Sequence, residues 1–177
     1  MVIRARSLNI YLALGCVACL VNGCSGPERA HKRVAATLAV HLETGASNGD
    51  RAMTISLFRN NPLQMMVEKN AFISEAFISE AHVISVMDGF AITIQFDRRG
   101  SLLLEQYSAG NRGRRLAIHA EFGKDLEQNR WLGAPLISKR ISDGVLTFTP
   151  DATREEADQI VLGLNNVAKK VHDKSPW

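Results

Sequence analysis

Cysteine is almost absent from this sequence of 177 residues, and its placement excludes several kinds of chemistry. The three cysteines, Cys16, Cys19 and Cys24, all lie within the first 24 residues. Cys16 and Cys19 fall in a predicted leader and Cys24 at its end, so residues 25–177 have no thiol for a disulfide, a metal site or a nucleophile. The folded part must therefore owe its stability to its core.

A strong charge of either sign is also missing. The 21 basic and 18 acidic residues leave a net charge of +3, most of which goes if Arg4 and Arg6 are removed with a leader. This small excess gives no case for a nucleic-acid partner. An apolar fraction of 46% and few prolines are typical of a globular chain, and the length suits one domain plus a targeting segment.

The N-terminus predicts a signal peptide over residues 1–23. Arg4 and Arg6 give it a positive start, and the apolar run at 8–21 is too short for a comfortable transmembrane span. After this run the sequence has no second apolar segment long enough to cross a membrane. We therefore expect a chain that is addressed to the translocon and exported to a bacterial cell envelope.

The end of this leader, "VNGC" at 21–24, resembles the lipobox of bacterial lipoproteins: Leu, a small residue, Gly or Ala, then Cys. The resemblance implies that Cys24 carries the lipid, palmitate included, that residues 24–34 form a charged tether, and that the membrane is a partner. Ser25 favours the outer membrane over the periplasmic face of the inner one. A plain signal anchor, a secreted soluble protein and cleavage before Cys16 remain the alternatives.

Alternating apolar residues predict several strands separated by turns, and two segments have helical spacing. The expected fold class is therefore α+β: one domain over 35–172, with a mixed or antiparallel sheet packed against two main helices. The strands at 36–44 and 52–58 are expected to form a hairpin or to be neighbours. Further strands are expected at 63–69, 82–87, 90–96, 114–122, 132–141 and 145–150, a short connection at 123–131, and helices at 97–111 and 151–172.

Three local signals predict where a hairpin turns and where the two helices begin. Asp88-Gly89 predicts the two-residue turn of a hairpin over 82–96. Asp97 is placed to cap the first helix, and Thr153, with Asp151 as the alternative cap, begins the second. Glu156 stands three residues after Thr153, as in a capping box.

The stretch "AFISEAFISEA" at 71–81 repeats five letters, a period that belongs to neither a helix nor a strand. Its Ser-Glu pairs have no histidine nearby in sequence and predict no nucleophile. Ser74 followed by Glu75 is instead typical of a helix start. We predict a short helix near 74–80 with Phe72 and Ile73 extended before it.

Catalytic motifs are weak, and no cofactor, metal or enzymatic activity is expected. The histidines are scattered, and only His119 and Glu121 share a strand face in a way that could hold a metal with a third ligand. Arg112, Arg114 and Arg115 follow the first helix and could bind an anion. A polar pair on a sheet and a solvated turn are the favoured interpretations, because no third ligand or phosphate motif accompanies them.

Several segments in order resemble the head subdomain of the large periplasmic domain of SecD, the accessory subunit of bacterial protein export. The family motifs match at Ser74-Glu75 with Ile78 and Ala81, at Phe96-Asp97 with Gly100, at Asn111-Gly113-Arg114 with Leu116-Ala117-Ile118, at Ala134-Pro135-Ile137, at Ile141-Gly144 and at Glu155-Glu156-Ala157. The match covers residues 70–165 and leaves 35–69 outside it. Residues 121–131 stand where the family has a tight turn.

The resemblance implies a non-enzymatic, lipid-anchored protein that binds a polypeptide or another envelope or export component. SecD has transmembrane helices that couple export to the proton gradient, and this sequence has none after its leader, so we expect a stand-alone relative and not that motor. Pairing of an extended segment with a sheet edge near Pro135 is the expected mode. The candidate binding surface comprises Arg130, Trp131 and Pro135 with Arg112, Arg114 and Arg115. The alternative is a metal- or anion-binding enzyme using His119, Glu121 and 112–115.

Overall fold

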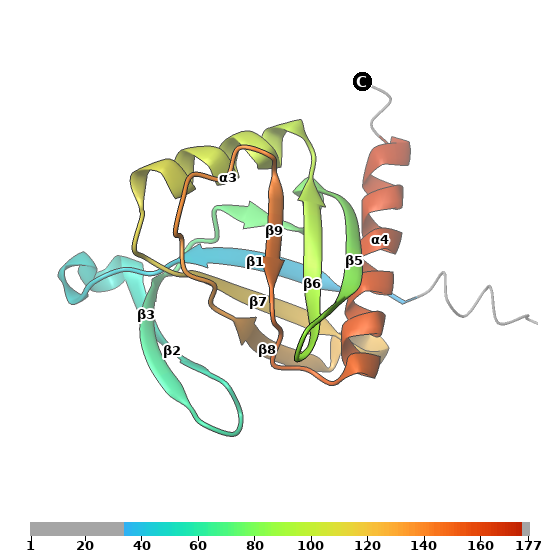
Figure 1. Cartoon of the computed structure of the whole chain (residues 1–177), viewed down its shortest axis with the longest axis horizontal. Helices are drawn as coiled ribbons and strands as arrows, with labels where there is room; N and C mark the ends of the chain where they lie inside the picture. Colours follow the sequence, from blue (N-terminus) through green and yellow to red (C-terminus); the bar gives the residue numbers. More distant parts are fainter. Residues whose placement is uncertain (1–33, 175–177) are drawn as a thin grey trace, which may run out of the picture. The chain divides into compact units, whose positions relative to one another are not determined.

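The computed structural model describes residues 34–174, so the expected signal peptide, Cys24 and nearly all of the expected tether lie outside the described residues. The helices and strands follow the labels of Figure 1. They are β1 (Thr37–Leu42), the 3-10 helix η2 (Ala46–Arg51), β2 (Ala52–Leu57), β3 (Leu63–Glu68), β4 (Ile73–Ser74), η3 (Glu75–Phe77), β5 (Ile78–Val86), β6 (Gly89–Phe96), α3 (Arg98–Gly110), β7 (Leu116–Phe122), η4 (Lys124–Leu126), β8 (Gln128–Gly133), β9 (Val145–Phe148) and α4 (Arg154–Lys174). None of the helices within 34–174 is long and apolar enough to cross a membrane.

The strands form two sheets and a separate ribbon, all with antiparallel pairing (Figure 1). The larger sheet has the order β4-β1-β7-β8, the smaller one β5-β6-β9, and β2 pairs with β3 alone. Together with α3 and α4 this confirms a single α+β domain with antiparallel sheets and two main helices.

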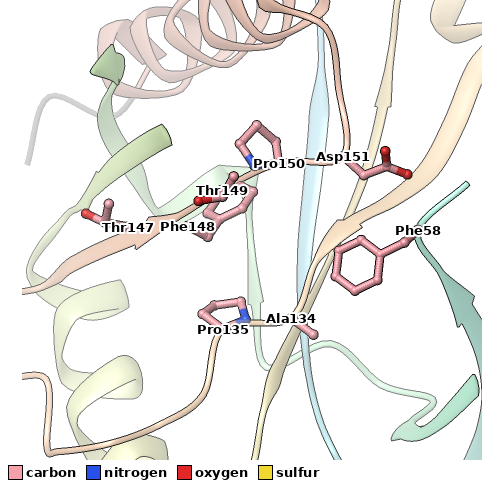
Figure 2. A pocket seen from close by; sticks show the side chains of 8 residues that line it. All are labelled: Phe58, Ala134, Pro135, Thr147, Phe148, Thr149, Pro150 and Asp151. Atoms are coloured by element: carbon pink, nitrogen blue, oxygen red, sulfur yellow. The ribbon is translucent and has the colours of Figure 1, made fainter. Parts of the chain in front are cut away.

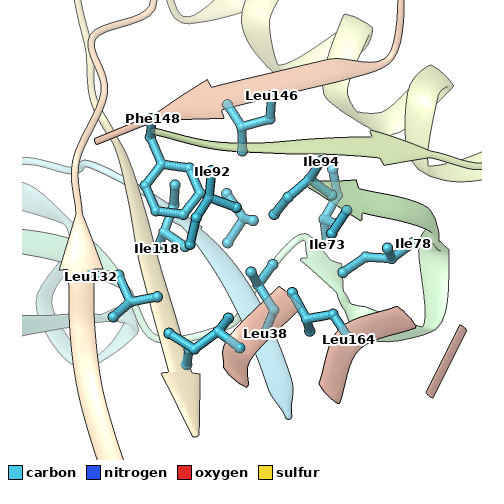
Figure 3. Close-up of a cluster of buried hydrophobic side chains, with 14 of the residues drawn as sticks. Leu38, Ile73, Ile78, Ile92, Ile94, Ile118, Leu132, Leu146, Phe148 and Leu164 are labelled. Atoms are coloured by element: carbon cyan, nitrogen blue, oxygen red, sulfur yellow. The ribbon is translucent and has the colours of Figure 1, made fainter. Parts of the chain in front are cut away.

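The core lies between the two sheets and the buried face of α4 (Figure 3). Every second residue of β1 and of β6 enters it, as the sequence alternation predicted. Fully buried members include Leu38 and Val40 of β1, Ile92 and Ile94 of β6, Ile118 of β7 and Leu164 of α4. The core is therefore aliphatic, with Phe96, Phe122 and Phe148 as its buried aromatic side chains among the described residues.

The helix caps and the hairpin are confirmed. The Asp97 carboxylate accepts from the Gly100 N–H at 2.7 Å, and Thr153 and Glu156 form the reciprocal bonds of a capping box at 3.2 and 2.8 Å. The β5–β6 turn lies one residue earlier than expected, because Val86 pairs with Gly89 and leaves Met87 and Asp88 as the turn. Gly89 has a φ of 145°, which favours glycine.

The predicted pairing of the two first strands is wrong. β2 pairs with β3 across the short loop 58–62, and β1 instead takes a central position between β4 and β7. Four of the six β1 residues are buried, on both faces, because other parts of the chain cover both sides of the sheet at β1. The alternation correctly predicted a strand, but it carries no information on which distant strand completes the ladder.

The predicted helix at 74–80 is also wrong beyond one turn. Ser74 does precede a 3-10 turn, but that turn spans only Glu75–Phe77, and the chain continues from Ile78 as β5. A register shift between Ile78 and Glu80 leaves both Ile78 and Ala81 buried. A bulge of this kind places two buried residues three positions apart, which is also the spacing of one face of a helix.

The segment around Pro135 is displaced from its predicted place. The strand occurs at Gln128–Gly133, where an irregular connection was expected. Past Gly133 one isolated bridge, between Leu136 and Arg115, joins the chain to the residue before β7. Gln128 and Asn129 are exposed polar residues at a sheet edge, so the apolar alternation that marks a strand is missing there. The strand expected over 132–141 is therefore wrong beyond Gly133, and Pro135 lies two residues past the end of β8, the last strand of its sheet.

Candidate functional site

A groove runs along β9, between that strand and the residues that follow β8. Its larger hollow has a volume of about 590 Å³ and is lined by Phe58, Ala134, Pro135 and the segment 147–151. Figure 2 shows the Phe58 ring beside Ala134 and Pro135, opposite Thr149 and Pro150. A second hollow of about 300 Å³ lies between 136–143 and β9, and Thr147 lines both. We call the two hollows together the β9 groove.

The backbone of Thr147 faces this groove. Phe96 N–H donates to the Gly144 carbonyl at 3.0 Å, which sets the alternation of the β6–β9 ladder. The ladder bonds then fall at Leu146 and Phe148, while Val145 and Thr147 direct their N–H and C=O groups away from β6. The Val145 N–H is taken by the Asp143 side chain at 3.1 Å. Thr147 is thus the free edge position of β9 within residues 34–174.

The opposite wall offers a second free edge at Leu136. The Pro135 carbonyl accepts from Leu116 N–H, and Ile137 N–H donates to Arg114, so these backbones point toward the start of β7. Leu136 lies between them and therefore directs its own N–H and C=O away from β7. Its side chain is 54% exposed. The β9 groove is thus flanked by two extended segments with outward-facing peptide groups.

Two of the other sheet edges, those of β8 and β5, are covered in part by specific contacts. At the outer edge of β8 the Leu132 carbonyl accepts from Asp151 N–H at 2.6 Å. At the outer edge of β5 the Asn165 side chain of α4 bonds both the N–H and the C=O of Ala81, at 2.8 and 2.9 Å. These closures protect edges that would otherwise pair with other chains, and they leave the centre of β9 accessible.

Phe58 lines one side of the β9 groove, and its own backbone is strained. Its φ is 62°, a conformation that a bulky residue rarely adopts, and its side chain is 41% exposed. The loop is held by Arg59, whose N–H donates to the Asp151 carboxylate at 2.9 Å. Phe58 was not identified as a site residue from the sequence. A second apolar residue directly after Leu57 breaks the alternation of β2, and this was the signal that could have indicated it.

The predicted surface residues occupy different places. Pro135 lines the β9 groove, whereas Arg130 is 15% exposed, lies 2.7 Å from the Glu156 carboxylate and covers the Phe122 ring at 4.9 Å. Trp131 lies on the outer face of the larger sheet, with its ring centroid 5.1 Å from His41 and 4.9 Å from His119.

The three arginines of the predicted anion site do not act together. Arg115 donates to the Ala134 carbonyl at 3.1 Å and so helps to position the groove wall. Arg112 and Arg114 are exposed and take part in no ion pair within 34–174. The turn therefore supports the groove through Arg115, and its other two charges face solvent.

His119 and Glu121 share a strand face, as expected, but Asn129 joins them. His119 Nε2 lies 2.6 Å from Asn129 Oδ1, and Asn129 Nδ2 donates to Glu121 at 3.3 Å. Among the described residues no three His, Cys, Asp or Glu side chains are grouped to hold a metal. The arrangement supports a polar network on the sheet surface.

The buried His41 gives a testable pH dependence. Burial lowers its pKa below the ordinary value of 6.5, against the hydrogen bond that Nδ1 donates to the Glu68 carbonyl at 2.8 Å, and the charge of His119 adds to the lowering. The unfolded chain therefore binds a proton near pH 6.5 that the folded chain does not, so stability is full above pH 6.5 and falls as the pH drops below it. The slope is at most about 1.4 kcal/mol per pH unit.

Urea unfolding between pH 8 and pH 5 measures this loss. His41→Asn keeps a donor for the Glu68 carbonyl but cannot titrate, so its stability should change less over this range. Equal slopes for the two proteins would contradict the assignment to His41.

Comparison with known proteins gives a family match, and the similar structures include two of SecDF. The family model described as SecDF, P1 head subdomain, matches residues 52–168. A SecDF structure titled as a membrane component that enhances protein export is 18% identical with a TM-score of 0.53, covering 78% of this chain and 67% of that chain. SecDF in its super-membrane-facing form is also 18% identical, with a TM-score of 0.54, covering 74% of this chain and 19% of the other. No curated protein matches.

The structural similarity at this low sequence identity shows a shared fold and nothing more. This chain spans two thirds of the first structure and a fifth of the second. The family match extends upstream to residue 52, so the β2–β3 ribbon that carries Phe58 belongs to the shared domain. It covers well over half of the sequence. The chain therefore belongs to the SecDF P1 head subdomain family.

Proposed function

We propose that this domain binds extended segments of unfolded polypeptide in the β9 groove during protein export. The observation that carries the proposal is the free peptide group of Thr147 between two hollows, across from the outward-facing peptide group of Leu136. A strand added to a sheet edge gains main-chain hydrogen bonds that are independent of sequence. That suits a protein that has to hold many different chains.

The hollows add side-chain recognition to the backbone pairing. Successive side chains of a bound strand point to opposite sides, so alternate residues would enter the space beside Phe58, Pro135 and Phe148. The other hollow is lined by Leu136, Lys139 and Arg140, and Arg140 is paired with Glu105. An apolar or aromatic residue in the ligand therefore fits the larger hollow best.

The link to export is supported by the family and by a relative whose title describes enhanced protein export. The proposed setting is the bacterial cell envelope, with Cys24 as the lipid anchor and residues 24–34 as the tether. The anchor is supported by the lipobox-like residues 21–24. The domain would then meet polypeptides on the outer side of the inner membrane or at the outer membrane, without catalysing a reaction.

Thr147→Pro is expected to weaken polypeptide binding about tenfold, because it removes the one N–H that β9 presents to the groove. Proline is tolerated at such a position since Thr147 donates no ladder bond to β6. Binding is measured by fluorescence anisotropy of the full chain with reduced, carboxymethylated α-lactalbumin, a permanently unfolded polypeptide.

Thr147→Val is the matched control. It also loses the 3.0 Å hydroxyl contact with Thr93 but keeps the backbone N–H, so it should bind as the wild type does. Equal affinity of the proline and valine variants, both folded by circular dichroism, would remove β9 pairing as the mode of binding.

A further inference from the structure

The end of the β5–β6 hairpin is apolar and exposed. Ile84 and Val86 are 38% and 43% exposed on one face of β5, and Met87 in the turn is fully exposed. These three residues, which we call the hairpin tip, account for three of the seven large hydrophobic side chains that are exposed within residues 34–174. A solvent-facing turn gains nothing from such residues, because they neither cover the core nor close the turn.

A cation lies at the base of the hairpin tip. The Arg154 guanidinium, at the first turn of α4, lies 5.7 Å from the Phe90 ring of β6, and the side chain is 47% exposed. Asp158 stands 3.4 Å from it, and Asp88 occupies the turn beside Met87. Exposed apolar side chains at a hairpin turn, with an arginine on the opposite face of the hairpin, suit an element that enters the interface of a bilayer.

The hairpin tip also lies within reach of the point where the chain enters the domain. Asn166 of α4 donates to the Val34 carbonyl at 3.0 Å, which fixes the entering chain against the middle of this helix. Twelve residues of α4 separate Arg154 from Asn166, a distance of about 18 Å along the helix axis. The ten residues from Cys24 to Val34 span up to about 35 Å when extended. A chain held at a membrane by Cys24 can therefore place the hairpin tip on that same membrane.

We propose that the hairpin tip docks on the lipid surface to which the chain is anchored, with Met87, Val86 and Ile84 in the upper acyl region and Arg154 at the headgroups. This second contact fixes the orientation of the domain on the membrane, which a single point of attachment does not do. It goes beyond the proposed polypeptide binding, since none of its residues lines the β9 groove. It rests on the proposed anchor only for the choice of membrane.

The test uses the full chain, purified from membranes and reconstituted into vesicles of phosphatidylethanolamine and phosphatidylglycerol. Met87→Trp places a fluorophore at the hairpin tip, and lipids brominated in the upper acyl chain quench it if it enters the bilayer. Leu102→Trp is the control. Leu102 is 57% exposed on α3, which begins at the far end of β6 from the hairpin turn (Figure 1).

The expected result is several-fold stronger quenching of Met87→Trp than of Leu102→Trp, after subtraction of the wild-type signal from Trp131 and Trp177. Equal quenching at the two positions in chains that float with the vesicles would overturn the proposal. A Met87→Trp blue shift that rises with protein density but is insensitive to brominated lipid would also overturn it, by assigning the tip to a second copy of the chain.

A flotation assay tests the lipid anchor separately from docking of the hairpin tip. If the chain does not float with vesicles, the anchor has failed, and the same vesicles are then titrated into the free Met87→Trp chain. A blue shift with added lipid would support docking of the hairpin tip alone, and an unchanged spectrum would overturn it.

Discussion

Replacing Arg130 by alanine is expected to lower the free energy of unfolding by about 2–3 kcal/mol, although the sequence suggested a surface role for it. The guanidinium is largely buried, stacks on Phe122 and lies 2.7 Å from the Glu156 carboxylate. Alanine removes the buried stem of the side chain and leaves Glu156 without its nearest cation. Arg59, at 3.8 Å from Glu156 and half exposed, compensates only in part.

Acid unfolding provides an independent readout of the same contact. Burial works to raise the pKa of Glu156, but the Thr153 N–H and the charges of Arg130 and Arg59 outweigh it and hold the pKa below the ordinary value of 4.5. The folded carboxylate is then stabilised above pH 4.5, and this stability is lost as the pH falls through the lowered pKa. Arg130→Ala raises that pKa, so the loss of stability in acid should become smaller.

Urea unfolding at pH 7 measures the first effect, with Arg154→Ala as the control. Arg154 forms an exposed pair with Asp158 on the same helix and lies 5.7 Å from the Phe90 ring, so its replacement should cost about 1 kcal/mol or less. In the double variant Arg130→Met and Glu156→Gln, both charges are removed together and much of the stability should return. A cost for Arg130→Ala no larger than that for Arg154→Ala would show that the contact is only a surface pair.

This stabilising role connects Arg130 to the β9 groove indirectly. Glu156 caps α4 through Thr153, and Asp151, just before the cap, receives the N–H of Arg59 and donates its own to Leu132. The loop that carries Phe58 is thus fixed through Arg59 to Asp151 and to Glu156, and Glu156 is also the carboxylate that pairs with Arg130. We expect Arg130 to hold the groove wall in place without touching a bound polypeptide.

The elements that could be predicted from the sequence are those whose cause is local. The β5–β6 hairpin, the Asp97 cap and the Thr153–Glu156 capping box depend on residues within a few positions of one another. The helix predicted at 74–80 failed for a local reason as well. A β-bulge at Ile78–Glu80 spaced two buried residues as a helix would, and pairing with β6 decided between the alternatives.

The candidate site could be predicted only where one segment supplies it. Pro135 lines the β9 groove, but Phe58 and Thr147 reach the same groove from two other parts of the chain. Which peptide groups stay free follows from ladder alternation between strands about fifty residues apart, as for Thr93 and Thr147. No pattern within β9 itself distinguishes a paired edge from a free one, so this part of the site required the structure.

Replacing Gly163 by valine is expected to lower the free energy of unfolding by about 3 kcal/mol, and alanine by less but in the same direction. A Cβ at this position in α4 would lie 2.6 Å from the Ala36 nitrogen and 2.7 Å from the Ala35 carbonyl carbon. Both are backbone atoms of the entering chain, which Asn166 holds at Val34, so they cannot yield as a flexible side chain would. The gain of about 1 kcal/mol from replacing glycine inside a helix does not offset this.

Gly110→Ala is the matched control, because Gly110 is also helical but a Cβ there has nothing within 4 Å. Alanine at 110 should therefore raise the stability by about 0.5 kcal/mol, whereas alanine at 163 lowers it, both measured by urea unfolding. If both variants are stabilised, residues 34–36 can leave α4 at little cost. Opposite signs mean that residues 34–36 are held firmly against α4. The first turn of the same helix carries Arg154, which lies over Phe90 near the hairpin tip, and Glu156, which lies near Arg59 of the groove loop.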